Sequence, residues 1–368
     1  MEIADCGILD VEIFFWCNRF NKSQNPKILK SQNLKIINKK IRHQTFSMHS
    51  FEDLSKAFKE KFEVAHFPAA PATLYNPNNY FLSIGGKRIR PVMCLMGNEL
   101  FGEIIPDSYH VATAIELFHN FTLIHDDIMD KAPLRRGMQT VHEKYDASTA
   151  LLAGDVMLVR AYDYLNKIKT VFIHRILHLF NKTAKEVCEG QQLDMDFEKQ
   201  EQVSLDQYLQ MIELKTSVSL AASLQSGAIL GGAGAGNQQH LYEFGRNLGI
   251  AFQVQDDYLD AFGDPEKFGK KPGGDIISNK KTFLMIHALE IAPAPQKKLL
   301  LQLMKENPAD KVAKVLEIFT ACGVDKWAVD LKEKYTRIAF QHLEDIAVMA
   351  ARKEPLRQLA AFLVKREY

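Results

Sequence analysis

The sequence has none of the features that mark a secreted or membrane-spanning protein. Its five cysteines are odd in number and form no CxxC pair, so neither a disulfide framework nor a zinc-binding cysteine cluster is indicated. It contains no run of about 18 apolar residues, so no segment is expected to span a membrane. We therefore expect reduced thiols and a cytoplasmic location.

The sequence also lacks an excess of charge of either sign. Its 46 Lys and Arg nearly balance 45 Asp and Glu, which leaves a formal net charge of +1. This balance gives no global attraction to nucleic acid or to an anionic membrane, and we expect neither as a partner. Any anionic ligand must therefore be bound by a local cluster of basic residues.

Strand-like alternation bounded by hairpin turns is absent as well. After Met48, apolar residues recur at spacings of three and four, which predicts helices. The segments with this period are Phe51–Phe62, Tyr109–Ile124, Ala150–Ile168, Ile173–Cys188, Leu205–Leu230, His240–Leu259 and Val312–Ala350. A break is expected at Pro68–Pro77 and at several glycine-rich stretches. We expect one all-α domain, a large helical bundle around a deep central cavity.

The first 47 residues differ from the rest in composition. Between Ile13 and Ser50 there are eight Lys or Arg and no acid, in a stretch rich in Asn, Ile and Phe. We expect residues 1–47 to be a disordered tail or an upstream extension from a mis-assigned start, and the working domain to be 48–368. A targeting peptide is the alternative, although the apolar stretch Ile13–Trp16 is short for a secretory signal and transit peptides favour Arg and Ser.

Two aspartate clusters with the spacing DDxxD lie about 130 residues apart, each on an apolar helical segment. Their members are Asp126, Asp127 and Asp130, and Asp256, Asp257 and Asp260. The first and last aspartates of each share a helical face, where they repel one another unless cations join them. Mg²⁺ suits such all-oxygen ligands and keeps room for substrate phosphates. A single cluster could be a solvated helix end, but two on separate apolar helices indicate a site. EF-hand loop spacing is absent.

Basic groups accompany both clusters. Arg135-Arg136 follow the first cluster just after Pro133, and adjacent arginines suit bidentate phosphate recognition. A second basic turn spans Gly85–Pro91, where glycines permit close backbone approach, although it lacks the pattern of a Walker A loop. A third basic stretch, 268–281, follows the second cluster. Together with six aspartates, these groups predict a site for two polyphosphates, one bound through metal and one bound directly.

In this order, the motifs GGKRIRP, HNFTLIHDDIMD, LRRG, LKT, FQVQDDYLD and GKKPGGD resemble those of the trans-isoprenyl diphosphate synthases, also called polyprenyl synthetases, of the short-chain type. The resemblance runs from about Phe51 to the C-terminus. It implies a helical bundle of the isoprenoid synthase type, a homodimer, and three Mg²⁺ ions that clamp an allylic diphosphate. It also implies a transferase that joins isopentenyl diphosphate to that allylic diphosphate by ionisation, condensation and elimination.

The resemblance assigns roles residue by residue. Positions matching metal ligands are Asp126 and Asp130 for two ions, supported by Asp127, and Asp256 for the third, with Asp257 and Asp260 beside it. Positions matching allylic diphosphate contacts are Arg135, Lys215, Thr216, Gln253, Lys270 and Lys280. Positions matching isopentenyl diphosphate contacts are Lys87, Arg90, His119 and Arg136. Relatives carry Gln where this chain has His119, but both can donate to a phosphate. Alternatively, His119 is a core histidine and Lys215 a surface lysine.

Product length depends on where the cavity ends. Phe121 lies five residues before Asp126, about 7.5 Å back along a helix. A ring there would act as a floor, and Thr122, one step nearer, is smaller than the aromatic residue of many farnesyl-type relatives. The resemblance thus favours geranylgeranyl diphosphate as the product, followed by farnesyl diphosphate. Alternatively, Phe121 merely packs between helices.

Two other functions would use a similar site. A class I terpene cyclase shares the ionisation step, but its second metal motif normally differs from DDxxD, and it needs no isopentenyl diphosphate site. A non-catalytic partner subunit of a prenyl synthase would be expected to have lost aspartates, whereas this chain keeps all six. Neither alternative explains the basic turns together with both clusters.

Overall fold

The computed structural model describes residues 48–264 and 273–365, and these are helical almost throughout. The α-helices are α3 (Phe51–Phe62), α4 (Ala72–Ser83), α5 (Ile89–Glu99), α6 (Pro106–Met129), α7 (Val141–Lys144), α8 (Ala147–Leu165), α9 (Thr170–Lys199), α10 (Leu205–Ile212), α11 (Val218–Leu230), α12 (Ala235–Phe262), α14 (Gly274–Ile277), α15 (Phe283–Ile291), α16 (Ala294–Glu306), α17 (Lys311–Ala321), α18 (Val324–Asp345) and α19 (Ala350–Val364). A π-helical turn, η1 (Glu213–Ser217), joins α10 to α11. The all-α prediction is confirmed.

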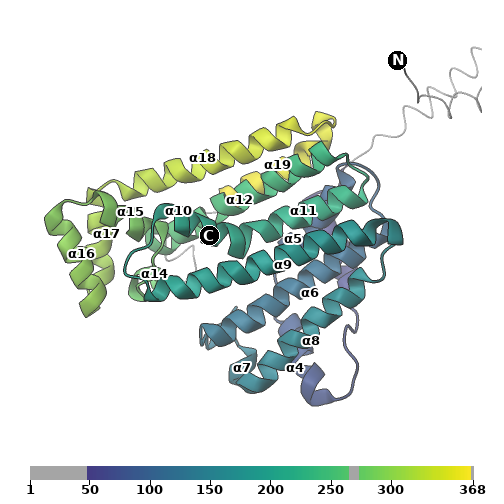
Figure 1. Cartoon of the computed structure of the whole chain (residues 1–368), viewed down its shortest axis with the longest axis horizontal. Coiled ribbons are helices and arrows are strands. Elements are labelled where there is room, and N and C mark those ends of the chain that lie inside the picture. Colours follow the sequence, from purple (N-terminus) through teal and green to yellow (C-terminus); the bar gives the residue numbers. More distant parts are fainter. Residues whose placement is uncertain (1–47, 265–272, 366–368) are drawn as a thin grey trace, which may run out of the picture. The chain divides into compact units, whose positions relative to one another are not determined.

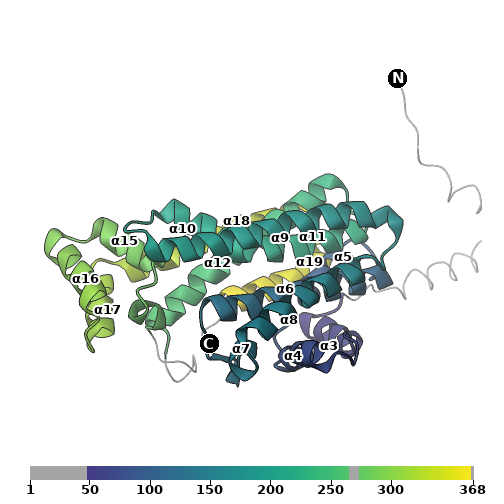
Figure 2. The same cartoon turned by 60° about the horizontal axis from the view of Figure 1, so that its bottom comes forward.

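The long helices form the body of the bundle. Helices α6, α9, α11, α12 and α18 run side by side (Figures 1 and 2). Helices α4, α7 and α8 lie on the side of α6, and α15–α17 gather at one end (Figure 1). None of the described helices combines the length and apolarity needed to cross a membrane.

The buried apolar residues form two clusters within the bundle. One is built mainly from α3, α5, α6, α8, α9 and α11, and the other from α10, α15, α16 and α17. Helices α12 and α18 are long enough to contribute to both clusters, with Leu248 and Val254 of α12 on either side of the junction. The second aspartate cluster therefore sits on a helix that is anchored along its whole length by burial.

The structure departs from the predicted boundaries at several places, two of which have a clear local cause. The segment Val312–Ala350, predicted as one helical pattern, is split by Gly323, whose φ of 71° lies in the left-handed region and ends α17. The predicted break at Pro68–Pro77 ends earlier, because α4 begins at Ala72 and carries Pro77 inside it. Proline within a helix removes one backbone hydrogen bond and crowds the preceding turn, at a cost of about 3 kcal/mol. Burial of Pro77, Asn78 and Phe81 offsets this cost.

A hairpin that the sequence did not indicate follows α6. Its strands are β1 (Leu134–Arg135) and β2 (Met138–Gln139), paired antiparallel. The two connecting residues, Arg136 and Gly137, have φ of 54° and 78°, as in a two-residue type I′ turn. This tight turn fixes Arg135 on a strand directly beyond the first aspartate cluster.

Candidate active site

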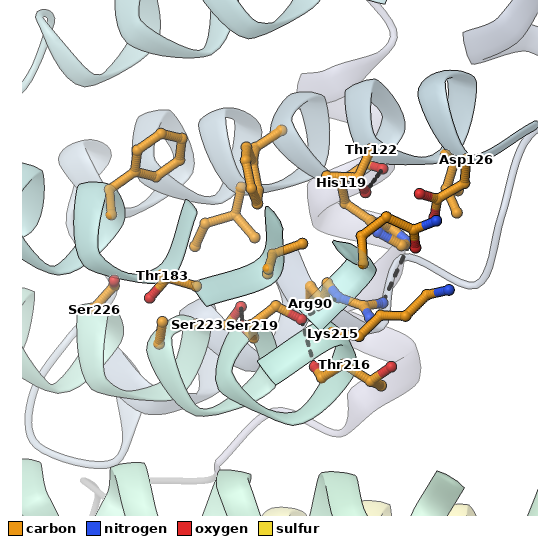
Figure 3. Close-up of a pocket in the computed structure, with 17 residues that line it drawn as sticks. Arg90, His119, Thr122, Asp126, Thr183, Lys215, Thr216, Ser219, Ser223 and Ser226 are labelled. Carbon is orange, nitrogen blue, oxygen red and sulfur yellow. Dashed lines mark hydrogen bonds between the residues drawn. The ribbon is translucent and has the colours of Figure 1, made fainter. Parts of the chain in front are cut away.

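An elongated cavity runs between α6, α9 and α11, with α5 at one side. It is lined by Arg90, Ile115, Phe118, His119, Thr122, Leu123, Asp126, Phe180, Thr183, Val187, Gln191, Lys215, Thr216, Ser219, Ala222, Ser223 and Ser226. Asp126 and Lys215 lie at one end, and Ser226 lies at the other (Figure 3). The cavity thus has a charged mouth and a largely apolar interior, which suits a substrate with an ionic head and a hydrocarbon tail.

The first aspartate cluster closes α6. Asp126 lines the cavity, whereas Asp127 is buried and bound by Arg135, whose Nε lies 2.9 Å from both carboxylate oxygens. The Nη2 of Arg135 adds a contact of 2.8 Å to Asp127 Oδ1. Asp130 is the exposed C-cap of the helix. The structure thus gives the adjacent aspartates different surroundings: Asp127 holds an arginine and Asp126 faces the cavity.

The charge on Asp126 is disfavoured in the chain alone. Burial raises the pKa of Asp126 to about 6, and Asp130 adds to this, although Lys215 acts in the opposite direction. The negative end of the α6 dipole also lies at this cluster. A cation bound by Asp126 and Asp130 would relieve both effects, so the donor set fits a hard dication such as Mg²⁺.

Lys215 and Thr216 reach the cavity from the π-helical turn η1. Such turns are frequent at functional sites because they displace side chains from the regular helical register. Helix α9 approaches closely at Gly190, where a Cβ atom would lie only 2.2 Å from the backbone nitrogen of Lys215. Lys215 Nζ lies 2.5 Å from Asp194 Oδ2 of α9. Sequence analysis missed Asp194, because this residue belongs to none of the motifs. Its only distinguishing feature in the sequence is its position one helical turn after Gly190.

The second cluster lies near the end of α12. Asp257 is buried and accepts hydrogen bonds from the Tyr208 hydroxyl and, at 3.0 Å, from Gln253 Nε2. Burial raises the pKa of Asp257, against the lowering effects of Lys280, Tyr208 and Gln253. Asp260 accepts a hydrogen bond of 2.9 Å from the backbone nitrogen of Asp275. Tyr208, another residue that sequence analysis missed, belongs to the apolar face of α10.

A polar hollow continues the site beyond Lys215. It is lined by Asp130, Asp194, Lys215 and residues 278–281 among others. This hollow brings Lys280 to the same space as Asp130, as expected from the motifs. Burial acts to lower the pKa of Lys280, but Asp257, Asp275 and Asp194 together raise it above its usual value, so Lys280 remains charged.

The predicted isopentenyl diphosphate residues also lie close together. Arg90 Nη1 lies 3.2 Å from His119 Nε2, and Arg90 Nε donates to Ser219 Oγ at 2.9 Å. The Arg136 guanidinium lies against Gly86, where a Cβ atom would come within 3.0 Å of Nη1. This contact joins the turn that carries Lys87 to the arginine hairpin. The two basic turns, which are far apart in the sequence, therefore form one surface.

Electrostatics in this basic group favour an anionic ligand. Burial lowers the pKa of Arg90 to about 10, and burial and the neighbouring Arg135 lower the pKa of Arg136. Burial, followed by Arg90 and Arg136, holds the pKa of His119 well below its usual value. His119 is thus neutral, accepts from Arg90 at Nε2 and keeps its Nδ1 hydrogen available. Repulsion among these cations would be offset by a bound diphosphate.

Phe121 does not line the cavity, in contrast to the prediction that its ring forms the floor. The Phe121 ring packs against Phe118, with 5.8 Å between centroids, and against His125, with 4.7 Å. Phe118 does line the cavity and crosses Phe180 at 5.3 Å. Thr122 lines the cavity near its mouth. Lys270, predicted to contact the allylic diphosphate, lies outside the described residues, as do residues 1–47.

The fold is an all-α bundle, and its site combines an elongated apolar cavity, two aspartate clusters and a basic surface. These features define a class of enzyme that binds prenyl diphosphates. Comparisons with known proteins identify the family. The polyprenyl synthetase family model matches residues 71–321. The geranylgeranyl diphosphate synthase of Methanosarcina mazei is 37% identical over 302 residues, which cover 81% of this chain and 91% of that protein.

The geranylfarnesyl diphosphate synthase of Natronomonas pharaonis is 32% identical over 347 residues, covering 87% of this chain and 100% of that protein. A crystal structure of a geranylgeranyl pyrophosphate synthase matches with a TM-score of 0.82 and 41% identity, covering 87% of this chain and 100% of that one. This chain belongs to the polyprenyl synthetase family. The resemblance drawn from the motifs is confirmed, and with it the expectation of a short-chain prenyltransferase enzyme.

Proposed function

We propose that this chain condenses isopentenyl diphosphate with allylic diphosphates and releases geranylgeranyl diphosphate as its main product. The observation that carries the proposal is the position of Lys215. It lies at the mouth of the apolar cavity and also lines the polar hollow with Asp130 and Lys280. An allylic diphosphate would place its tail in the cavity and its head among these charges.

The chain's own residues would promote ionisation by stabilising the leaving diphosphate. Arg135 is oriented by Asp127, and Lys215 by Asp194, so neither cation has to reorganise as negative charge develops. The allylic cation that remains would react with water in an open site. The apolar lining from Leu123 to Phe118 excludes water from the prenyl tail.

Three Mg²⁺ ions are part of this proposal. Asp126 and Asp130 would hold two of them and Asp256 the third, with Asp260 nearby. Mg²⁺ supplies electrostatic stabilisation of the phosphate oxygens that gain charge when the C1–O bond breaks. The raised pKa of Asp126 supports this assignment, because a cation removes the cost of a charged buried carboxylate.

Isopentenyl diphosphate would bind to the basic surface formed by Lys87, Arg90 and Arg136, with His119 donating from Nδ1. Its double bond would attack C1 of the allylic partner once the C1–O bond breaks, and the departing diphosphate would accept the proton whose loss completes the product. Because the arginines are partly buried, each contact to the diphosphate is worth more than it would be at an exposed site. The neutral state of His119 leaves it a donor without adding to the crowding of positive charge.

The cavity length supports a C20 product. From Asp126 to Ile115 there are eleven residues of α6, or about 16.5 Å. An extended isoprene unit has four main-chain carbon–carbon bonds and advances about 5 Å. Three units, about 15 Å, fit, whereas four do not. The longest primer that fits is then farnesyl diphosphate, and one further condensation gives geranylgeranyl diphosphate, with farnesyl diphosphate as a shorter alternative.

A homodimer and a cytoplasmic location complete the proposal. Helix α8 exposes a stripe of large apolar side chains, namely Leu151, Leu152, Val159 and Tyr162. At 100° per residue they fall within one 100° sector of the helix, which favours burial against a second copy of this chain. The three cysteines among the described residues, Cys94, Cys188 and Cys322, carry free thiols, in keeping with a reducing compartment.

A turnover assay tests the proposal. The full chain is incubated with Mg²⁺, labelled isopentenyl diphosphate and dimethylallyl, geranyl or farnesyl diphosphate, and the products are resolved by chain length. We expect C20, and we expect Asp126→Asn to lower turnover at least about 10²-fold, because a lost metal contact costs several kcal/mol. Asp330→Asn, a change at an exposed position of α18, is the matched control and should be silent.

Other outcomes would contradict parts of the proposal. Elongation that stops at C15 would keep the reaction and overturn the cavity-length argument. Release of a hydrocarbon from geranylgeranyl diphosphate without isopentenyl diphosphate would indicate a terpene cyclase. Binding of diphosphate with no turnover from any primer would indicate a non-catalytic subunit.

A further inference from the structure

A second group of potential metal ligands lies far from the aspartate clusters. His240, in the second turn of α12, faces His342 and Asp345 in the last turn of α18. Asp256 follows His240 by sixteen residues on the same helix, a distance of about 24 Å. This group therefore belongs to neither the cavity nor the polar hollow.

The two histidines are spaced as metal ligands are. His240 Nδ1 and His342 Nδ1 lie 3.2 Å apart, with ring centroids separated by 5.5 Å. Two nitrogens bound to Zn²⁺ at about 2.0–2.1 Å with a tetrahedral angle lie about 3.3 Å apart. One carboxylate oxygen of Asp345 and one ring nitrogen of each histidine all lie within 4.8 Å of one another. Asp345 is exposed, and its carboxylate would supply the third ligand.

The surroundings also favour a cation. Both His342 and Asp345 lie at the C-terminus of α18, the negative end of the helix dipole. Gln341 Nε2 donates to Asp345 Oδ1 at 2.9 Å and orients the carboxylate. Asn237 Oδ1 accepts from the backbone nitrogen of Ala347 at 2.9 Å, so the start of α12 and the end of α18 are already held together.

We propose that His240, His342 and Asp345 form a binding site for a transition-metal dication of the zinc type, which fastens the start of α12 to the end of α18. Two imidazoles and one carboxylate with an open fourth position suit Zn²⁺ and disfavour Mg²⁺, which prefers all-oxygen ligands. The histidine site would thus select Zn²⁺, whereas the aspartate clusters would select Mg²⁺. Helix α12 carries the second aspartate cluster, so a metal here stabilises the helix that supports the candidate active site.

Titration calorimetry with Zn²⁺ tests this site. The full chain is stripped of metal and titrated in excess Mg²⁺, which occupies the aspartate clusters. We expect one strong Zn²⁺ site per chain. His240→Gln or His342→Gln should each lower the Zn²⁺ affinity of this site at least about 100-fold. Loss of a residue that only orients a metal ligand already lowers metal affinity about 10–100-fold. Asp345→Asn, an exposed change that spares the fold, should weaken it as well.

A matched control excludes adventitious binding. His174 and His178 are exposed and four apart on α9, a spacing that can also chelate a metal. The double change His174→Gln and His178→Gln should leave the strong site intact. Zn²⁺ should raise the Tm of the wild type and of this control, and should leave that of His342→Gln unchanged. Absence of a strong site, or its loss only in the α9 variant, would overturn the proposal.

Discussion

Replacing Phe118 by Ala should lengthen the product, whereas the same change at Phe121 should not. Phe118 lines the cavity eight residues before Asp126, about 12 Å along α6, and its ring crosses Phe180 near the far end. Phe121 packs on Phe118 from outside the lining. The two variants therefore remove identical groups from the same helix, but only at Phe118 does the space open into the cavity.

The magnitude follows from counting carbon atoms. Removing a phenyl ring deletes six carbons, and one isoprene unit contains five. The added space thus admits about one further unit, so a C20 primer can be accommodated and C25 should become the main product of Phe118→Ala. Burial of the Phe118 side chain makes the change costly, about 3–5 kcal/mol of the free energy of unfolding, a large share of a typical 5–15 kcal/mol.

The assay is product analysis by chain length with farnesyl diphosphate as primer. Phe118→Leu, which removes less of the ring, is a milder second variant, and turnover with geranyl diphosphate shows that each variant remains folded. C25 from Phe118→Ala with C20 from Phe121→Ala is the expected pair. The reverse pair would show that the cavity ends at Phe121 and would refute the reasoning.

Three further changes test buried polar contacts. Tyr208→Phe removes a donor from buried Asp257 and should cost about 1–3 kcal/mol in urea denaturation, and an unchanged midpoint would contradict this. Glu116→Ala leaves Arg88 without its buried partner and should cost about 3–5 kcal/mol; a loss below 1 would indicate a solvated pair. Burial lowers the pKa of His66 to about 4, from 6.5 when unfolded. Its neutral form therefore stabilises the fold above pH 6.5, and about 3 kcal/mol is lost as pH falls to 4. The wild type's stability advantage over His66→Gln should shrink accordingly between pH 7 and pH 4; a constant difference would exclude this role.

The helices could be predicted from the sequence because apolar spacing reflects burial. Phe51–Phe62 was predicted with the bounds that α3 shows. The break at Gly323 was missed because α17 and α18 both bury apolar residues, so the period continues across it. The hairpin at Leu134–Gln139 was missed because two-residue strands are too short to display a period of two.

The site could be predicted only as far as spacing and motif order allowed. Helical spacing placed Asp126 and Asp130 together, but Asp194, the partner of Lys215, and Tyr208, the partner of Asp257, come from other helices and carry no local signal. The prediction for Phe121 used the rise along the helix and ignored rotation. Five residues at 100° each turn the side chain 140° away from Asp126, whereas Ile115, eleven residues back, returns to within 20° of it.

The two DDxxD clusters are alike in sequence, but the structure gives their aspartates different surroundings. Their second aspartates match, because Asp127 and Asp257 are both buried and both bound by protein donors. Their last aspartates do not match. Asp130 is exposed and lines the polar hollow, whereas Asp260 accepts the backbone nitrogen of Asp275. A carboxylate that already accepts a backbone hydrogen has less capacity for a cation than one that faces the hollow. The last aspartates of the two clusters therefore differ in surroundings, an asymmetry that arises from Asp275 in the first turn of α14 and that the repeated motif alone does not contain.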